Sequence, residues 1–206
     1  AGIHASVVSK SAFEGSGLTE SSQRGARFLG ADGFEERIAA AARASADPPS
    51  LTYVYDSDLD ATGHKHGVDS VQWRGQLAMI DDQAEQMRES LPDDVRIVVV
   101  ADHGMVDARA EEDRIDIDTV PGLRDGVALV GGEARFRQLY CHIGAADDVA
   151  GAWRERFPDR AEVLTREQAI ARGWFGAVEE RVLPRIGDVV VAARGSSAFF
   201  SSASAQ

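Results

Sequence analysis

Apolar and polar positions along the first 106 residues form short blocks that alternate between two kinds of pattern. Near-continuous apolar runs are typical of buried strands, and apolar positions repeated every three to four residues are typical of helices. Strands are therefore expected at residues 3–8, 51–55 and 97–101, and helices at residues 32–46 and 69–90. Because strands and helices follow one another, the pattern predicts an α/β fold, with a mostly parallel sheet and flanking helices.

The ends of the two predicted helices carry recognisable signals. Asp32 is the expected N-cap of the first helix, and the Asp-Pro-Pro sequence at residues 47–49 is expected to stop it. Pro92 follows the end of the second helix. Residues 9–27 are polar and rich in glycine, which predicts a loop with one turn of helix.

The pattern changes after Val106, where the segments become shorter and more polar. Strands are expected at residues 127–130, 135–142, 161–164, 188–193 and 198–201, with helices at 145–156 and 166–172. Gly131 and Gly132 are expected to form a tight hairpin turn between the first two of these strands. We therefore divide the chain into part of an α/β core (1–106), an inserted α+β subdomain (107–185) and strands that return toward the core (186–206).

Composition narrows the possible functions. The 206 residues carry 34 acidic and 22 Lys or Arg side chains, a net charge of −12. This charge argues against binding to a nucleic-acid duplex, which requires Lys and Arg against phosphates, although bound divalent metals would still allow a small phosphorylated substrate. With a single cysteine and no signal peptide, a cytoplasmic location is favoured. No apolar run approaches the roughly 20 residues needed to span a membrane.

Candidate chemistry lies directly after the second and third predicted strands. Asp60 and His64 follow one strand, and Asp102 and His103 follow the other. Because the carboxyl ends of parallel strands meet at one edge of a sheet, the two pairs are expected to face each other there. A carboxylate with an imidazole suits zinc, with manganese as a substitute. The pattern predicts two divalent metal ions in the core, and with them metal-assisted hydrolysis of a phosphate ester or anhydride.

Neighbouring acidic and histidine side chains are less specific signals. Asp56 and Asp58 flank the same loop, where solvated carboxylates are a simpler interpretation than metal ligands. His66 is likewise expected to be solvated. His142, beside the single cysteine, is expected to be structural, because one Cys and one His are a poor metal signature.

Two stretches carry a resemblance to a known family. Residues 53–67 read Tyr-Val-Tyr-Asp-Ser-Asp-Leu-Asp-Ala-Thr-Gly-His-Lys-His-Gly, and residues 98–105 read Val-Val-Val-Ala-Asp-His-Gly-Met. Together they resemble the type I phosphodiesterase / nucleotide pyrophosphatase family, which is part of the alkaline phosphatase superfamily. Residues 13–19 and 186–191 fit bacterial members of that family.

The resemblance implies a two-zinc hydrolase of phosphodiester or nucleotide pyrophosphate bonds. In that family, residues that match Asp60 and His64 bind one zinc, and residues that match Asp102 and His103 bind the other. A Thr or Ser nucleophile attacks the phosphorus and forms a covalent phospho-enzyme, which water then hydrolyses. The implied substrate is a small phosphodiester or a nucleotide. No oligomeric state is predicted.

The sequence also departs from the family's pattern. The family's nucleophile and one further metal-binding Asp lie upstream of anything in this sequence, and Ser16 and Thr19 do not stand at the nucleophile position. The family's last metal-binding histidine lies near the carboxyl end, whereas no histidine follows His142. We therefore expect a fragment that contains no catalytic nucleophile, is inactive or nearly so alone, and binds metal weakly.

Two other interpretations stay open. Cofactor-independent phosphoglycerate mutases of the same superfamily share the Asp-x-x-x-His and Asp-His-Gly patterns, so a related phosphotransferase is one alternative. A non-catalytic fold fragment that binds at most one metal is the other. Sulfatases are disfavoured because the chain contains no Cys-x-Pro-x-Arg segment.

Overall fold

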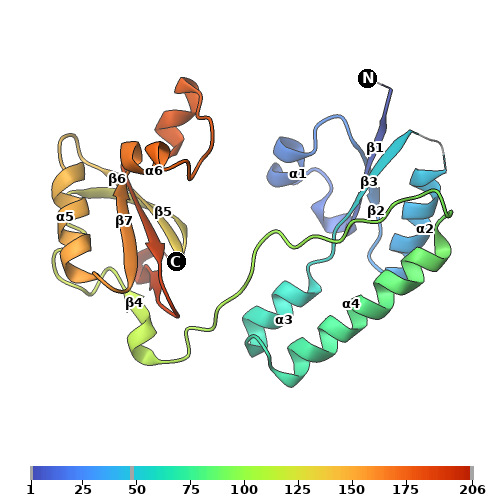
Figure 1. Cartoon of the computed structure of the whole chain (residues 1–206), viewed down its shortest axis with the longest axis horizontal. Coiled ribbons are helices and arrows are strands. Elements are labelled where there is room, and N and C mark those ends of the chain that lie inside the picture. The colour runs from blue at the N-terminus through green and yellow to red at the C-terminus, as the bar shows by residue number, and fades with distance from the viewer. Residues whose placement is uncertain (1, 47–48, 205–206) are drawn as a thin grey trace. The chain divides into compact units, whose positions relative to one another are not determined.

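The structure is a computed structural model that describes residues 2–46 and 49–204. The chain forms two compact units, Ala1–Met105 and Val106–Gln206 (Figure 1). Asp47 and Pro48, which were expected to stop a helix, lie outside the described residues. Across the described part of the chain, no helix combines the length and the apolar character that crossing a membrane requires.

The first unit is built on a parallel sheet. Its elements are β1 (His4–Ser9), η1 (Ser11–Phe13), α1 (Gly17–Ser22), β2 (Arg27–Gly30), α2 (Phe34–Ser45), β3 (Ser50–Val54), α3 (Asp58–His66) and α4 (Val71–Ser90). The strands lie in the order β2-β1-β3 and are all parallel, with Val7 of β1 opposite both Phe28 and Tyr53. The predicted α/β class with a parallel sheet is confirmed, as are its first two strands and both helices.

Helix α2 covers one face of this sheet. Val8, Ala31 and Ala40 form a small buried cluster between the sheet and the helix. Leu51 and Tyr53 alternate with half-buried residues of β3 and are exposed on the other side. Near-continuous apolar strands are typical of a parallel sheet covered on both faces, but at β3 the described residues cover only one.

The third predicted strand is not formed. Residues 95–101 have no regular secondary structure, and Val98, Val99 and Val100 are 74, 73 and 76% exposed. An apolar run becomes a strand only where another strand supplies hydrogen-bond partners, because the backbone groups of a lone strand stay unpaired. In the first unit, the described sheet consists of β1, β2 and β3, and this segment pairs with none of them.

The predicted N-cap of α2 is corrected. Gly33, not Asp32, is the N-cap, and the Asp32 carboxylate instead accepts hydrogen bonds from the N–H and hydroxyl of Ser11 at 2.9 and 3.0 Å. Glu36 accepts from the backbone N–H groups of Asp32 and Gly33.

The predicted loop at 9–27 contains η1 and α1 and runs into β2, whose two apolar residues are too few to identify a strand.

The second unit is built on an antiparallel sheet with strand order β5-β6-β8-β7. Its elements are η2 (Glu111–Asp113), β4 (Arg114–Asp116), β5 (Val127–Glu133), β6 (Phe136–Cys141), α5 (Ala146–Arg156), β7 (Ala161–Thr165), α6 (Arg166–Ala171), η3 (Glu180–Arg185), β8 (Val189–Ala193), β9 (Ala198–Phe200) and η4 (Ser202–Ser204). The short strands β4 and β9 pair in parallel. Trp153, Phe157 and Phe199 are buried together in its core, with ring centroids 5.0 to 5.8 Å apart. The predicted smaller α+β part is confirmed.

The hairpin of β5 and β6 is confirmed, but its turn lies later than predicted. Gly131 and Gly132 pair within β5, opposite Gln138 and Arg137, and the chain reverses after the end of that strand. Gly132 has a φ of +74°, and an added Cβ would overlap the carbonyl oxygen of Phe136. The strand's own geometry therefore requires this glycine, because other residues rarely adopt a positive φ.

The boundary between the two units falls between Met105 and Val106. Strands β8 and β9, which come from the predicted return segment 186–206, pair with strands of the second unit. That residues 107–185 form an insertion within an α/β core stays a prediction.

Candidate metal centre

Helix α3 brings together the first predicted pair of ligands. Asp60 and His64 are four residues apart on this helix, and Asp60 Oδ1 lies 3.5 Å from His64 Nε2. The His64 side chain is 72% exposed. Asp60 Oδ1 is buried and has no hydrogen-bond partner among the described residues. Such an atom calls for an explanation, because buried polar atoms nearly always have a partner.

This oxygen and this nitrogen fit a shared cation. Zinc binds oxygen and nitrogen ligands at about 2.0 to 2.2 Å, so two ligands at a tetrahedral angle lie about 3.3 to 3.5 Å apart. The observed separation of 3.5 Å between Asp60 Oδ1 and His64 Nε2 meets that requirement. Both donor types are ones that zinc and manganese accept. The pair therefore fits half of a metal site.

The second predicted pair lies in the irregular segment after the exposed valines. His103 Nδ1 donates a hydrogen bond to the carbonyl oxygen of Gly104 at 3.0 Å. In the neutral imidazole this leaves the lone pair on Nε2, which is the atom that a metal binds. Asp102 Oδ1 lies 3.8 Å from this Nε2 and accepts the backbone N–H of His103. The side chains of Asp102 and His103 are both more than half exposed, whereas that of Asp60 is 43% exposed.

The two motifs lie side by side in the first unit. A Cβ built on Gly63, which lies between the two predicted ligands of α3, would stand 2.5 Å from Met105 Sδ and 3.4 Å from Trp73. Met105 directly follows the Asp-His-Gly sequence. The space that Gly63 leaves on α3 is therefore filled by the second motif, and a larger residue there would push it away.

The pKa of Tyr55, the residue after β3, is affected by charges from both motifs. Burial raises the pKa of its phenol, and the negative charges of Asp102 and Asp60 raise it further. Its ring stacks on Tyr53 with centroids 6.3 Å apart and planes inclined by 16°. One carboxylate from each motif thus acts electrostatically on a single hydroxyl, in agreement with the contact between Gly63 and Met105.

Two buried or half-buried ion pairs hold the loop that leads into α3. Arg37 Nη2 donates to Asp56 Oδ2 at 2.8 Å, and the other oxygen of Asp56 accepts the backbone N–H of Asp58. Lys10 Nζ donates to Asp58 Oδ1 at 2.7 Å. Asp56 is therefore paired and 24% exposed, which corrects the expectation of a solvated carboxylate, whereas Asp58 is paired but still 42% exposed. No sequence motif pointed to Arg37 or Lys10, because each is far along the chain from its partner.

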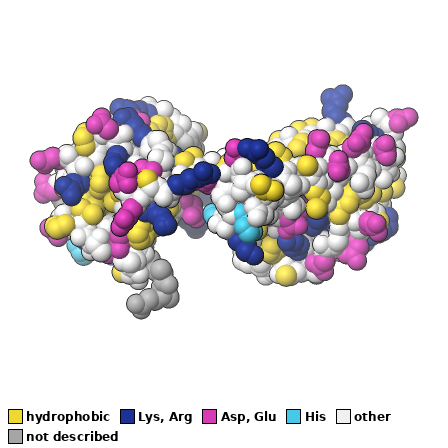
Figure 2. All heavy atoms as spheres, turned by 90° about the horizontal axis from the view of Figure 1, so that it is seen from below, with side chains coloured by type: hydrophobic (Ala, Val, Ile, Leu, Met, Phe, Trp, Pro, Cys, Tyr) yellow, Lys and Arg dark blue, Asp and Glu magenta, His cyan; other side chains and the backbone are white. Residues whose placement is uncertain are grey.

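The described residues do not form a complete metal-binding site. Among them, no group of three or more His, Cys, Asp or Glu side chains is close enough to hold one metal ion. Figure 2 shows that histidine side chains reach the surface. The hydroxyls of Ser16 and Thr19 have structural roles, since Ser16 caps α1 and Thr19 donates to the carbonyl oxygen of Phe13. The structure thus brings the two members of each pair together and sets Gly63 of the first motif against Met105 of the second, but the four predicted ligands do not form one group among the described residues.

Comparison with solved structures defines the class of fold. Murine ectonucleotide pyrophosphatase / phosphodiesterase 5 matches 96% of this chain with a TM-score of 0.72 at 18% identity, and the human protein matches 98% with the same TM-score and identity. Phosphonoacetate hydrolase from Sinorhizobium meliloti 1021 matches 82% with a TM-score of 0.56 at 20% identity. These likenesses show an alkaline-phosphatase-like α/β fold.

The chain belongs to the type I phosphodiesterase / nucleotide pyrophosphatase family, whose sequence profile matches residues 7–206. It covers 53, 54 and 43% of the murine, human and Sinorhizobium chains, so it spans about half the length of these solved structures. None of the curated proteins compared with the chain matches it.

Proposed function

We propose that this chain supplies four metal ligands to a metal-dependent hydrolase of phosphodiester or nucleotide pyrophosphate bonds. Asp60 and His64 would hold one divalent cation, and Asp102 and His103 would hold the other. Zinc is the preferred metal and manganese a substitute. The nucleophile, a Thr or Ser in this proposal, does not lie among the residues of this chain, so the chain alone would not turn over substrate.

The observation that carries the proposal is the contact between Gly63 and Met105. It joins a residue of the Asp-x-x-x-His motif to the residue that follows Asp-His-Gly, and so supports a site with two neighbouring cations. The buried Oδ1 of Asp60, which accepts no hydrogen bond among the described residues, adds a second reason, because a cation would satisfy it. Membership of the family supports the substrate class. An inactive variant of the murine relative has been solved in complex with AMP, which favours a nucleotide.

The chain's own residues prepare the site in three ways. The hydrogen bond from His103 Nδ1 to Gly104 orients the ring and leaves Nε2 as the ligand atom. Helix α3 holds Asp60 and His64 on one face. The pair of Arg37 and Asp56 fixes the loop before that helix. When bound, two divalent cations supply charge neutralisation at a phosphoryl group and activation of an attacking oxygen.

Zinc stoichiometry of the 206-residue chain tests the ligand assignment. We expect saturable zinc binding by calorimetry, with Asp60→Asn and His64→Ala each removing one zinc and Asp102→Ala and His103→Ala each removing the other. His66→Ala and His142→Ala are matched histidine controls and should leave the stoichiometry unchanged. Absence of saturable binding, or unchanged stoichiometry in Asp102→Ala and His103→Ala, would overturn the assignment.

A nitrophenyl phosphodiester tests the statement about the nucleophile independently of metal binding. With zinc or manganese added, the chain alone is expected to release nitrophenol no faster than buffer with the same metal. Turnover well above that background would show that a nucleophile lies within these residues, and the proposal for the missing group would then be wrong.

A further inference from the structure

A cavity of about 520 Å³ in the second unit is not used by the proposed function. It opens beside β7, which is an edge strand of the antiparallel sheet, and is lined by residues of α5, β7 and α6. Three arginines contribute to it, Arg154, Arg172 and Arg194, together with the single carboxylate of Glu162. Three positive charges and one negative charge leave two positive charges in excess, on a chain whose net charge is −12.

The carboxylate of Glu162 holds two of these arginines at the cavity. Arg172 Nη1 is paired with Glu162 Oε1, and Arg194 Nη2 lies 3.5 Å from Glu162 Oε2. Both arginine side chains are more than half exposed. A guanidinium carries five N–H donors, and each of these two uses one in the contacts found among the described residues. Most of their donors therefore remain available to an anion.

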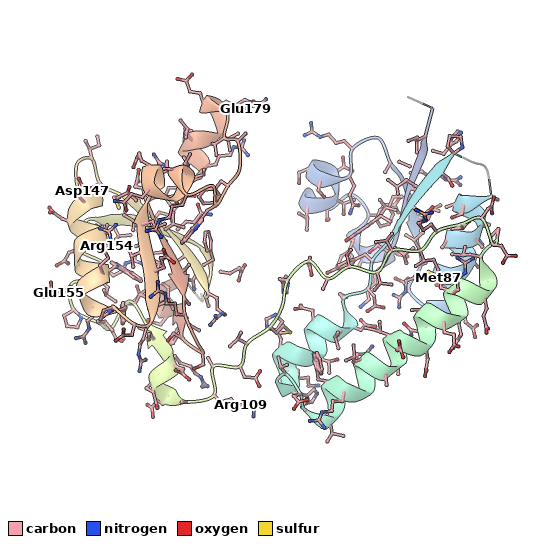
Figure 3. The ribbon with its side chains drawn as sticks, viewed as in Figure 1. Met87, Arg109, Asp147, Arg154, Glu155 and Glu179 are labelled. Atoms are coloured by element: carbon pink, nitrogen blue, oxygen red, sulfur yellow. The ribbon has the colours of Figure 1, made fainter. Side chains whose placement is uncertain are left out.

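The edge of β7 itself is already engaged. Arg154, labelled in Figure 3, donates from Nε to the carbonyl oxygen of Val163 at 2.9 Å and from Nη2 to Gln168 Oε1 at 2.7 Å. The backbone N–H of Thr165 donates to the same Gln168 oxygen. An incoming peptide strand would have to break these bonds, so strand addition is disfavoured. What the cavity offers is a set of guanidinium donors.

We infer that this cavity binds the phosphate group of a small phosphate monoester. Arg172 and Arg194 would hold the phosphate, because planar guanidinium groups match its oxygens in pairs. Pro158 and Ala171 line the same cavity and supply apolar surface for the organic part. Small-molecule sites measure about 300 to 1,000 Å³, and this cavity lies in that range. This volume leaves room beside the phosphate for a carbon skeleton.

Titration of the full 206-residue chain with ribose 5-phosphate, followed by NMR, tests this site. Chelator in the buffer keeps divalent metals away, so the result is independent of the metal centre. We expect saturable shifts of amides in β7 and α6, and binding at least threefold tighter than that of inorganic phosphate. Saturation without such a preference would assign the site to free phosphate and overturn the monoester assignment.

Removing the arginines and removing the Glu162 carboxylate are expected to change the binding affinity in opposite directions. Arg172→Gln with Arg194→Gln is expected to weaken binding at least tenfold, whereas Arg181→Gln, which alters an exposed arginine paired with Glu179 elsewhere in the unit, should leave it unchanged. Glu162→Gln should tighten binding severalfold, because it removes the carboxylate that competes for both guanidinium groups. No shifts at the cavity, or weaker binding in Glu162→Gln, would overturn the inference even if the double variant failed to fold.

Discussion

Arg37 Nη2 donates a 2.8 Å hydrogen bond to Asp56 Oδ2 and so ties the first turn of α2 to the loop before α3. The Arg37 side chain is 5% exposed and that of Asp56 is 24% exposed. Asp56 also accepts the backbone N–H of Asp58, the first residue of α3. The pair therefore fixes the point from which the helix presents Asp60 and His64.

Asp56→Ala is expected to destabilise the first unit by about 3 kcal/mol, because removing one partner of a buried ion pair leaves the other charge without compensation. Equilibrium denaturation measures this loss of unfolding free energy. Asp58→Ala is the matched control, since its pair with Lys10 is much more exposed. Exposed pairs contribute about 1 kcal/mol or less. Equal losses in the two variants would show that burial of Arg37 does not set the strength of its pair.

The contact between Gly63 and Met105 allows a second prediction. Gly63→Ala should displace the Met105 side chain, because its new Cβ would otherwise stand 2.5 Å from the sulfur. The flexible end of a methionine moves at low cost, and alanine is favoured over glycine in a helix by about 1 kcal/mol. We therefore expect little net change in stability but a clear shift of the Met105 methyl resonance in NMR.

Gly75→Ala is the control for this contact, because a Cβ there meets no atom of the described residues within 4 Å. It should stabilise α4 by up to about 1 kcal/mol and leave the Met105 methyl resonance in place. If the methyl resonance does not move in Gly63→Ala, the two motifs are not in contact. The main support for a shared metal centre is then lost.

Most regular elements could be predicted because their signals are local. The helix predicted at 69–90 has a long apolar periodicity and a following proline, and the structure forms α4 at Val71–Ser90. The helices and strands after residue 145 were also found, apart from shifts of a residue or two and short 3-10 turns. The four-residue spacing of Asp60 and His64 is likewise a local signal, because residues four apart share one face of a helix.

What could not be predicted depends on partners distant in sequence. Residues 97–101 have the composition of a strand, but composition does not reveal whether a neighbouring strand is available to pair with them. Arg37 and Asp56 are ordinary charged residues until the fold buries them together. Gly131 and Gly132 match a turn dipeptide, yet the register of β5 with β6 places them inside the strand. In each case long-range packing decided the outcome.

The exposed valines allow a third prediction. Replacing Val98, Val99 and Val100 together by threonine should change the unfolding free energy of this chain by no more than about 1.5 kcal/mol, because surface substitutions cost about 0.5 kcal/mol or less each. Burial of a valine is worth about 1.5 kcal/mol or more. A loss above about 4 kcal/mol in chemical denaturation would therefore mean that the segment is buried in a sheet, as its sequence suggested.

The hydrogen bonds of the Asp118 carboxylate allow a prediction of how low pH affects the second unit. This carboxylate accepts the Ser201 hydroxyl at 2.6 Å and the Ala203 N–H at 2.9 Å, and these bonds, with Arg124 nearby, hold its pKa below the ordinary value of 3.8. A carboxyl with a lowered folded-state pKa stabilises the fold fully above its unfolded-state pKa and loses that contribution as the pH falls through the folded-state value. We therefore expect protection of the Ala203 amide from hydrogen exchange to persist at pH 5 and to fall below about pH 3.8. In Asp118→Asn, which cannot ionise, protection should be lower at pH 5 and nearly independent of pH over this interval. An equally steep acid loss in that variant would assign the effect to another carboxyl group.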